Sequence, residues 1–70
     1  MAMQRHSILV GKCYRDAFGA VYRIVGFDGN VVQCILYHRT DRGLVEREHS
    51  DRWADFLADL QGEVECPPPA

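Results

Sequence analysis

The sequence predicts a mainly β protein, a small barrel or bent antiparallel meander of four to five strands capped by one C-terminal helix. The first observation is a pair of apolar runs, 20–27 and 31–38, on either side of Asp28-Gly29-Asn30, a turn sequence typical of a β-hairpin. The second observation is that, further along the chain, the spacing of apolar residues changes from that of a strand to that of a helix. Four residues with this spacing form one apolar stripe: Trp53, Phe56, Leu57 and Leu60.

The hairpin strands carry apolar groups on both faces, which predicts that they lie in the centre of the sheet. Residues 8–14 are expected to form an earlier strand, bent at Gly11 where another backbone approaches closely. A polar turn at 39–43 leads into a further strand at 44–49.

A turn is also expected at 15–19, with Asp16 as its hydrogen-bonding residue and Gly19 at positive φ. For the helix, Ser50 is a good N-cap, Asp51 suits the positive end of the helix dipole, and Gly62 can end the last turn. A helix this short is unstable alone in water, so its stripe, with Trp53 in it, must dock on the sheet.

Seventy residues make one domain at most. We expect a flexible N-terminal arm at 1–7, a single domain at 8–62 and a disordered proline-containing tail at 63–70. Short strands, tight turns and one docked helix favour an SH3-like roll for the domain.

The composition is that of an ordered globular protein, with 47% hydrophobic and 26% charged residues. A net charge of −2 gives no general attraction to nucleic acid or to an anionic membrane, and no apolar run reaches the length of a membrane span. The three cysteines, Cys13, Cys34 and Cys66, cannot all pair within one chain. Without a recognisable export segment, we expect a cytoplasmic protein with three reduced thiols, of which Cys66 in the tail is the most reactive.

Metal binding and catalysis find little support in the spacing of the reactive residues. Cys34 and His38 are the closest Cys–His pair, but four residues of β-strand separate them by about 13 Å, too far to share one zinc ion. No Cys or Ser has a base and an orienting group at a spacing that indicates a catalytic site. We therefore expect no metal, no cofactor and no enzymatic activity.

Basic and aromatic residues gather around the second polar turn, which makes this rim a candidate contact for nucleic acid or for a protein partner. Asp41, Glu46 and Glu48 interleave with the arginines, so a solvated surface of cross-strand ion pairs is the simpler interpretation. The candidate residues are Tyr37, His38, Arg39, Arg42, Arg47 and His49.

The helix and tail carry the opposite charge. Asp51, Asp55 and Asp59 recur every four residues, and residues 51–65 sum to −4 (five acids, one Arg) against +2 for residues 1–50 (seven basic, five acidic). Such a ridge is either a solvated face or an acidic docking face for a basic partner, which includes another copy of this chain.

Self-association is the last expectation from the residues. One short helix covers only one side of such a sheet, so an unclosed barrel would leave Val31, Ile35 and Tyr37 exposed as a contiguous patch. The edge at 44–49 is a poor template for self-pairing because Glu46, Arg47 and Glu48 put charges along it.

The pattern K-C-Y-R-D-A-F-G-A-V-Y-R-I-V-G-F-D-G, followed by W-x-x-F-L, resembles short SH3-like barrel proteins of phages and mobile elements. The match covers residues 11–60, and it implies a compact non-enzymatic module without assigning functional residues. The sequence as a whole therefore predicts a binding module for a protein partner or for itself, with nucleic-acid binding through the arginine-rich turn as the alternative.

Overall fold

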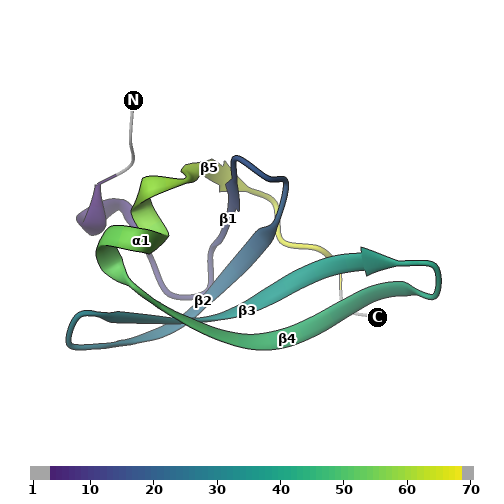
Figure 1. Ribbon diagram of the computed structural model, residues 1–70, viewed down its shortest axis with the longest axis horizontal. Helices are drawn as coiled ribbons and strands as arrows, with labels where there is room; N and C mark the ends of the chain where they lie inside the picture. The colour runs from purple at the N-terminus through teal and green to yellow at the C-terminus, as the bar shows by residue number, and fades with distance from the viewer. Residues whose placement is uncertain (1–3, 69–70) are drawn as a thin grey trace.

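The computed structural model describes residues 4–68 as one antiparallel five-stranded sheet with a single α-helix (Figure 1). The elements in chain order are η1 (Arg5–Ser7), β1 (Cys13–Asp16), β2 (Val21–Asp28), β3 (Val31–Thr40), β4 (Gly43–Arg52), α1 (Trp53–Ala58) and β5 (Leu60–Val64). The strand order is β4-β3-β2-β1-β5, and the two outer strands do not pair with each other. The predicted mainly β architecture is confirmed, in the form of a bent meander whose sheet is not closed.

The hairpin of β2 and β3 forms as predicted, at the centre of the sheet. Asp28 pairs with Val31, which leaves Gly29 and Asn30 as a two-residue loop. Gly29 has a φ of 59° and Asn30 has no positive φ, as in a type II′ turn, whose twist matches that of the strands.

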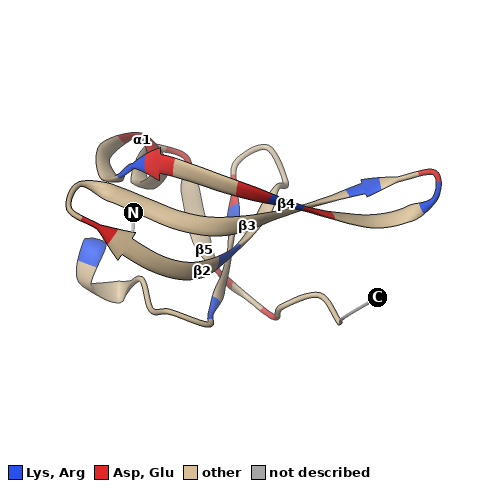
Figure 2. Ribbon diagram, turned by 90° about the horizontal axis from the view of Figure 1, so that it is seen from below, with Lys and Arg blue, Asp and Glu red and all other residues tan. Residues whose placement is uncertain are grey.

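The β3–β4 hairpin is longer than the sequence pattern predicts. Its register runs from Val31 opposite Arg52 to Thr40 opposite Gly43, whereas β2 pairs with β3 only as far as Tyr37. Residues 38–45 therefore project from the sheet as a two-stranded arm (Figures 1 and 2). Thr40 stabilises the tip, because its Oγ1 accepts from the Arg42 N–H at 3.2 Å and donates to the Gly43 carbonyl at 3.0 Å.

β1 starts at Cys13, later than predicted. The chain turns at Gly11, whose φ is +87°, and the Gly11 N–H donates to the Ile24 carbonyl at 2.8 Å, so the close backbone approach predicted at Gly11 is confirmed. After β1, Asp16 Oδ1 accepts from the backbone N–H groups of Phe18 and Ala20, both at 2.9 Å, as expected for the first turn.

The helix is much shorter than predicted. Ser50 belongs to β4 opposite Gln33, and Gly62 belongs to β5 opposite Arg15, so neither residue caps a helix. Both residues lie in strands that pair with a neighbouring strand, and this tertiary pairing overrides the local helical pattern. The actual N-cap is Arg52, whose side chain makes no capping hydrogen bond.

The core lies on the face of the sheet that α1 and the N-terminal segment cover. Its buried residues are Ile8, Tyr14, Ile24, Val32, Cys34, Trp53, Phe56 and Leu60. The helical stripe thus docks as predicted, although Leu60 reaches the core from a strand.

Trp53 connects three segments that are far apart in the sequence. Its ring lies 5.1 Å from the Phe27 ring in a stacked arrangement, and the Arg5 guanidinium lies 4.5 Å from its centroid. Its backbone N–H donates to the Asn30 carbonyl at 2.9 Å, and Arg5 also donates to the Gly29 carbonyl at 2.9 Å. Residues 5–7 of the expected flexible arm are therefore a docked 3-10 turn, and residues 1–3 lie outside the described part of the chain.

A disulfide between Cys13 and Cys66 ties the C-terminal segment to β1, so the prediction of three reduced thiols, with Cys66 the most reactive, is wrong. Cys34 is the free cysteine and is buried. The expected tail also begins later than residue 63, because Glu63 and Val64 pair with β1 as part of β5. The predicted cytoplasmic location was based partly on reduced thiols. Because disulfides persist mainly in oxidising compartments, the cysteines no longer support that prediction. No helix in residues 4–68 is long and apolar enough to cross a membrane.

Truncation of Trp53 is expected to remove the contacts that join the helix, the hairpin loop and the N-terminal turn. We predict that Trp53→Ala lowers the free energy of unfolding by about 3–5 kcal/mol, measured by urea denaturation. Trp53→Phe is the matched control, since it keeps a ring beside Phe27 and removes an indole N–H that is buried without a partner. An alanine variant that unfolds at nearly the parent urea concentration would contradict the docked arrangement.

The disulfide closes a loop with a sequence separation of 53 residues, so its loss frees much chain entropy in the unfolded state. We predict that Cys66→Ser lowers the free energy of unfolding by about 4 kcal/mol. Cys34→Ser serves as a control that keeps the disulfide. Mass-shift labelling of the denatured, non-reduced protein is expected to modify one thiol per chain; modification of three would show that the bond does not form.

Candidate functional site

The largest hollow on the described surface lies between the β3–β4 arm, the turn before β2 and the C-terminal prolines. We call it the hairpin groove, and its volume is about 880 Å³. The residues that line it are Phe18, Gly19, Ala20, Val21, Tyr37, His38, Arg39, Thr40, Asp41, Gly43, Leu44, Pro67 and Pro68. The groove is therefore built from three segments that the disulfide and the sheet bring together.

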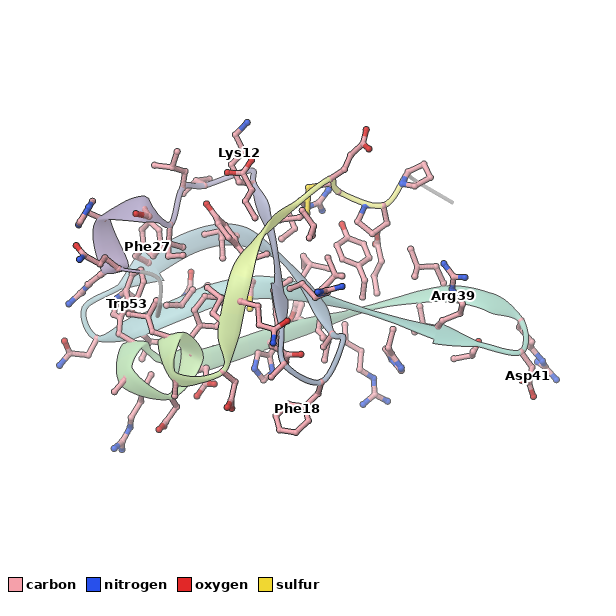
Figure 3. The ribbon with its side chains drawn as sticks, turned by 90° about the horizontal axis from the view of Figure 1, so that it is seen from above. Lys12, Phe18, Phe27, Arg39, Asp41 and Trp53 are labelled. Carbon is pink, nitrogen blue, oxygen red and sulfur yellow. A yellow bond between two sulfur atoms is a disulfide. The ribbon has the colours of Figure 1, made fainter. Side chains whose placement is uncertain are left out.

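Phe18 is the most exposed large apolar side chain of the described residues, at 83%. It lies at the tip of the turn after β1 and points outward (Figure 3). Asp16 holds the turn in this shape through its bonds to the Phe18 and Ala20 N–H groups, while Gly19 takes a φ of +86° that other residues rarely adopt. The turn thus presents an aromatic ring to solvent from a rigid support.

Tyr37 is in the groove but is only 4% exposed. The Arg23 guanidinium lies 5.8 Å from its ring centroid. Arg39 follows on the same face of β3, opposite Leu44 of β4, and its side chain is exposed. Of the predicted basic rim, the groove therefore contains Tyr37 as a buried wall and the exposed Arg39 on the same face, while His38 borders the groove from the other face of β3.

The other members of the basic rim lie apart from the groove. Arg42 is exposed in the loop at the arm tip, while Arg47 and His49 lie opposite Leu36 and Cys34. His49 is half-buried, with its ring 5.5 Å from that of Tyr22. The structure does not gather the six predicted contact residues into one site.

The strand alternation also separates the charges that were expected to pair. Arg47 and His38 share one face of the β3–β4 hairpin, and their direct cross-strand neighbours are Leu36 and Val45. Glu46 and Glu48 point to the opposite face, where they lie across from Tyr37 and Ile35. Neither Arg47 nor His38 therefore has a carboxylate directly opposite it on the neighbouring strand.

The exposed patch predicted from Val31, Ile35 and Tyr37 does not form as expected. These residues share a face of β3, but Tyr37 is buried and the other two are half-buried. Pro67 and Pro68, held near this face by the disulfide at Cys66, line the same groove as Tyr37. The C-terminal segment thus supplies a cover that the sequence pattern did not reveal.

The fold brings together the three aspartates of the predicted acidic docking face. Asp51, Asp55 and Asp59 line one small cavity of about 50 Å³, together with Asp16 and Tyr22. The Tyr22 hydroxyl donates to Asp16 Oδ2 at 2.9 Å. Burial of Tyr22, and next this hydrogen bond to a carboxylate, raise the pKa of the phenol well above its usual value. Among residues 4–68, no group of His, Cys, Asp or Glu has the arrangement of a metal site.

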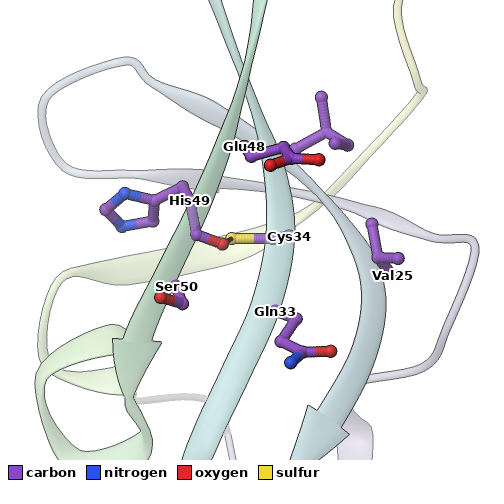
Figure 4. A pocket seen from close by; sticks show the side chains of 7 residues that line it. Val25, Gln33, Cys34, Glu48, His49 and Ser50 are labelled. Carbon is purple, nitrogen blue, oxygen red and sulfur yellow. Dashed lines mark hydrogen bonds between the residues drawn. The ribbon is translucent and has the colours of Figure 1, made fainter.

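A second hollow, of about 540 Å³, lies on the sheet over β2, β3 and β4 (Figure 4). Polar side chains of Gln33, Glu48 and Ser50 line it beside the exposed Val25. The Cys34 thiol donates to the His49 carbonyl at 3.5 Å and not to the imidazole. Burial, and next the Asp51 carboxylate, raise the pKa of Cys34 to about 11, so the thiol stays protonated at neutral pH and is a weak nucleophile.

Two features of these sites were missed by reasoning from the sequence. The first is the exposure of Phe18, because the sequence predicts only that this residue lies in a turn. The pairing of Asp16 with Tyr22 has no signal in the sequence, because it depends on the register of β1 against β2.

Comparison of the chain with protein-family models, with curated proteins and with solved structures finds no match. The resemblance to phage and mobile-element proteins therefore stays a prediction.

The raised pKa values of Tyr22 and Cys34 predict a loss of stability in alkali. Above about pH 9 the unfolded chain releases these protons while the folded protein keeps them, so a rise in pH favours the unfolded state. We expect the free energy of unfolding to fall between about pH 9 and 11, as measured by urea denaturation at each pH. The variant with both Tyr22→Phe and Cys34→Ala is expected to show a shallower fall, and an equal slope would show that these groups do not titrate abnormally.

Proposed function

We propose that this protein is a small non-enzymatic module that binds an extended segment of a partner protein in the hairpin groove. The observation that supports this most directly is Phe18, a phenylalanine held 83% exposed at the groove by a hydrogen-bonded turn. Exposed aromatic side chains beside a groove are typical anchors of protein interfaces.

The chemistry of the groove indicates the kind of segment it accepts. Tyr37 and Leu44 provide an apolar floor, and Arg39 stands exposed on the same face of the hairpin. Asp41, at the distal end, is the acidic residue among those that line the groove. An apolar or aromatic anchor next to an acidic residue complements this surface.

The proline wall limits how such a segment binds. Pro67 and Pro68 have no backbone N–H, so this side of the groove cannot add a ligand as a new β-strand. The ligand must instead be held by side-chain contacts and by the polar groups of the arm. This matches the aromatic-lined grooves that receive extended peptides without forming a ladder of backbone hydrogen bonds.

Two features of Cys34 favour a non-enzymatic role. Its thiol is buried and directed at a backbone carbonyl, and its pKa of about 11 leaves little thiolate at neutral pH. Nucleophilic catalysis needs the reverse, an accessible thiol with a nearby base and a lowered pKa.

Nucleic-acid binding is the alternative function, and one observation favours it. Arg47 and His38 lie on one face of the β3–β4 hairpin, where their cross-strand neighbours are apolar, so no directly opposed carboxylate competes with a phosphate for these side chains. Arg42 is also exposed, at the tip of the hairpin. The overall charge of −2 weighs against this alternative.

Selection from a random peptide library displayed on phage tests the proposal. We expect selected peptides to be enriched in aromatic or apolar residues next to Asp or Glu. In NMR titrations they should shift the amide signals of Phe18, Arg39 and Leu44. Phe18→Ser should weaken the binding of a selected peptide by roughly tenfold or more, since interface aromatics contribute most to affinity.

Val10→Ser is the matched control, because Val10 is also highly exposed, at 59%, and does not line the groove. Peptides that bind both variants equally well would contradict the groove as the site. Titration with a short duplex and a single-stranded oligonucleotide tests the alternative. Binding that falls steeply with salt and is lost in Arg47→Ala, while no peptide is selected, would replace the proposal with nucleic-acid recognition.

A further inference from the structure

The outer edge of β4 is a second interaction surface, separate from the groove. β4 pairs with β3 on one side, and no described strand pairs with its other side. At ten residues it is as long as any strand in the sheet, and it forms the lower margin of the molecule in Figure 1. An edge strand of this length presents a row of unpaired N–H and C=O groups that can accept another strand.

The structure changes the charge pattern of this edge compared with the sequence-based prediction. The predicted strand, 44–49, contains the charges of Glu46, Arg47 and Glu48 without complementary partners. The observed strand continues through Ser50, Asp51 and Arg52. These three residues add one charge of each sign.

Symmetry limits how β4 can pair with β4 of a second copy. Antiparallel pairing across a two-fold axis keeps each face of the sheet on the same side, so directly opposed residues must share a face. The axis therefore lies midway between one residue and the same residue of the other copy. Each residue of β4 defines one such register.

These registers differ sharply in electrostatic energy. An axis at Arg47 would place Arg47 opposite its own copy and Glu46 opposite Glu48, and an axis at Glu48 would oppose two copies of Glu48. Like charges directly opposite one another destabilise a strand pair. An axis at Ser50 avoids like charges but leaves a shorter paired segment, residues 48–52.

An axis at His49 is the favourable arrangement. It pairs residues 46–52, with Glu46 opposite Arg52 and Arg47 opposite Asp51 of the other copy. By symmetry each of these pairs occurs twice, which gives four opposite-charge pairs and no like-charge pair. Arg47 and Asp51 lie on one face of the sheet, and Glu46 and Arg52 on the other.

From this complementarity we infer that two copies of the protein pair through the outer edge of β4, antiparallel and with His49 on the two-fold axis. The pairing joins the two five-stranded sheets into one continuous sheet. It leaves the hairpin groove of each copy outside the paired segment, because residues 46–52 do not line it.

Charge reversal at Glu46 and Arg52 tests this inference, since both side chains are exposed and their reversal leaves the core unchanged. Glu46→Arg alone places two arginines opposite each other across the interface, and Arg52→Glu alone places two glutamates opposite each other. Sedimentation equilibrium of the full chain is expected to show a dimer for the parent protein and a dissociation constant raised roughly tenfold or more for each single variant.

Two restorations provide the controls. The chain with both reversals has complementary pairs again and is expected to dimerise like the parent. An equimolar mixture of the two single variants is expected to form a heterodimer, because the arginine introduced in one variant then faces the glutamate introduced in the other. A constant monomer mass for the parent at all concentrations would overturn the inference. So would single variants that dimerise as well as the parent, or a mixture that gains nothing over its components.

Discussion

The packing of Trp53 is the interaction on which the rest of the structure depends. Its ring packs against the Phe27 ring and the Arg5 guanidinium, and its backbone N–H is bonded to the loop between β2 and β3. One residue thus holds together the N-terminal turn, the central hairpin and the helix that covers the core. In a chain of 70 residues the core is small, so a single aromatic side chain accounts for a large share of the buried apolar surface.

The opposite face of the sheet is organised in a different way. No helix among residues 4–68 covers it, and the Cys13–Cys66 disulfide instead holds the C-terminal segment beside it. Within the described residues this face has no second apolar layer, and the covalent link at this point compensates for it. Small domains often need such a link. The same link places Pro67 and Pro68 along the groove, so the element that stabilises the fold also shapes the proposed binding surface.

Charge is distributed by the alternation of the strands. Along β4 the basic Arg47 and the acidic Glu46 and Glu48 point to opposite faces, so neighbours in the sequence do not neutralise one another. On the helix side, the aspartates of β4 and α1 converge beside Asp16 and Tyr22. The side-chain alternation of the strands, and not the order of charges in the sequence, therefore decides which charges become neighbours on the surface.

The sequence by itself determined the features that depend on a few neighbouring residues. These are the central hairpin with its Gly29 turn, the turn held by Asp16, the bend at Gly11 and the burial of Trp53. Such features follow from the backbone freedom of glycine, from local side-chain hydrogen bonds and from the period of apolar residues.

Tertiary structure alone decided what depends on segments distant in the sequence. Ser50 and Gly62 belong to strands and not to helix caps, because β4 pairs with β3 and β5 pairs with β1. Cys66 pairs with Cys13 because β5 lies beside β1, a neighbour relation that no local pattern encodes. The hairpin groove, the cover over Tyr37 and the full length of the β4 edge have the same origin. Each of them forms where segments distant in the sequence are brought together. The loss of chain entropy in bringing such segments together is offset only by contacts made across the whole fold.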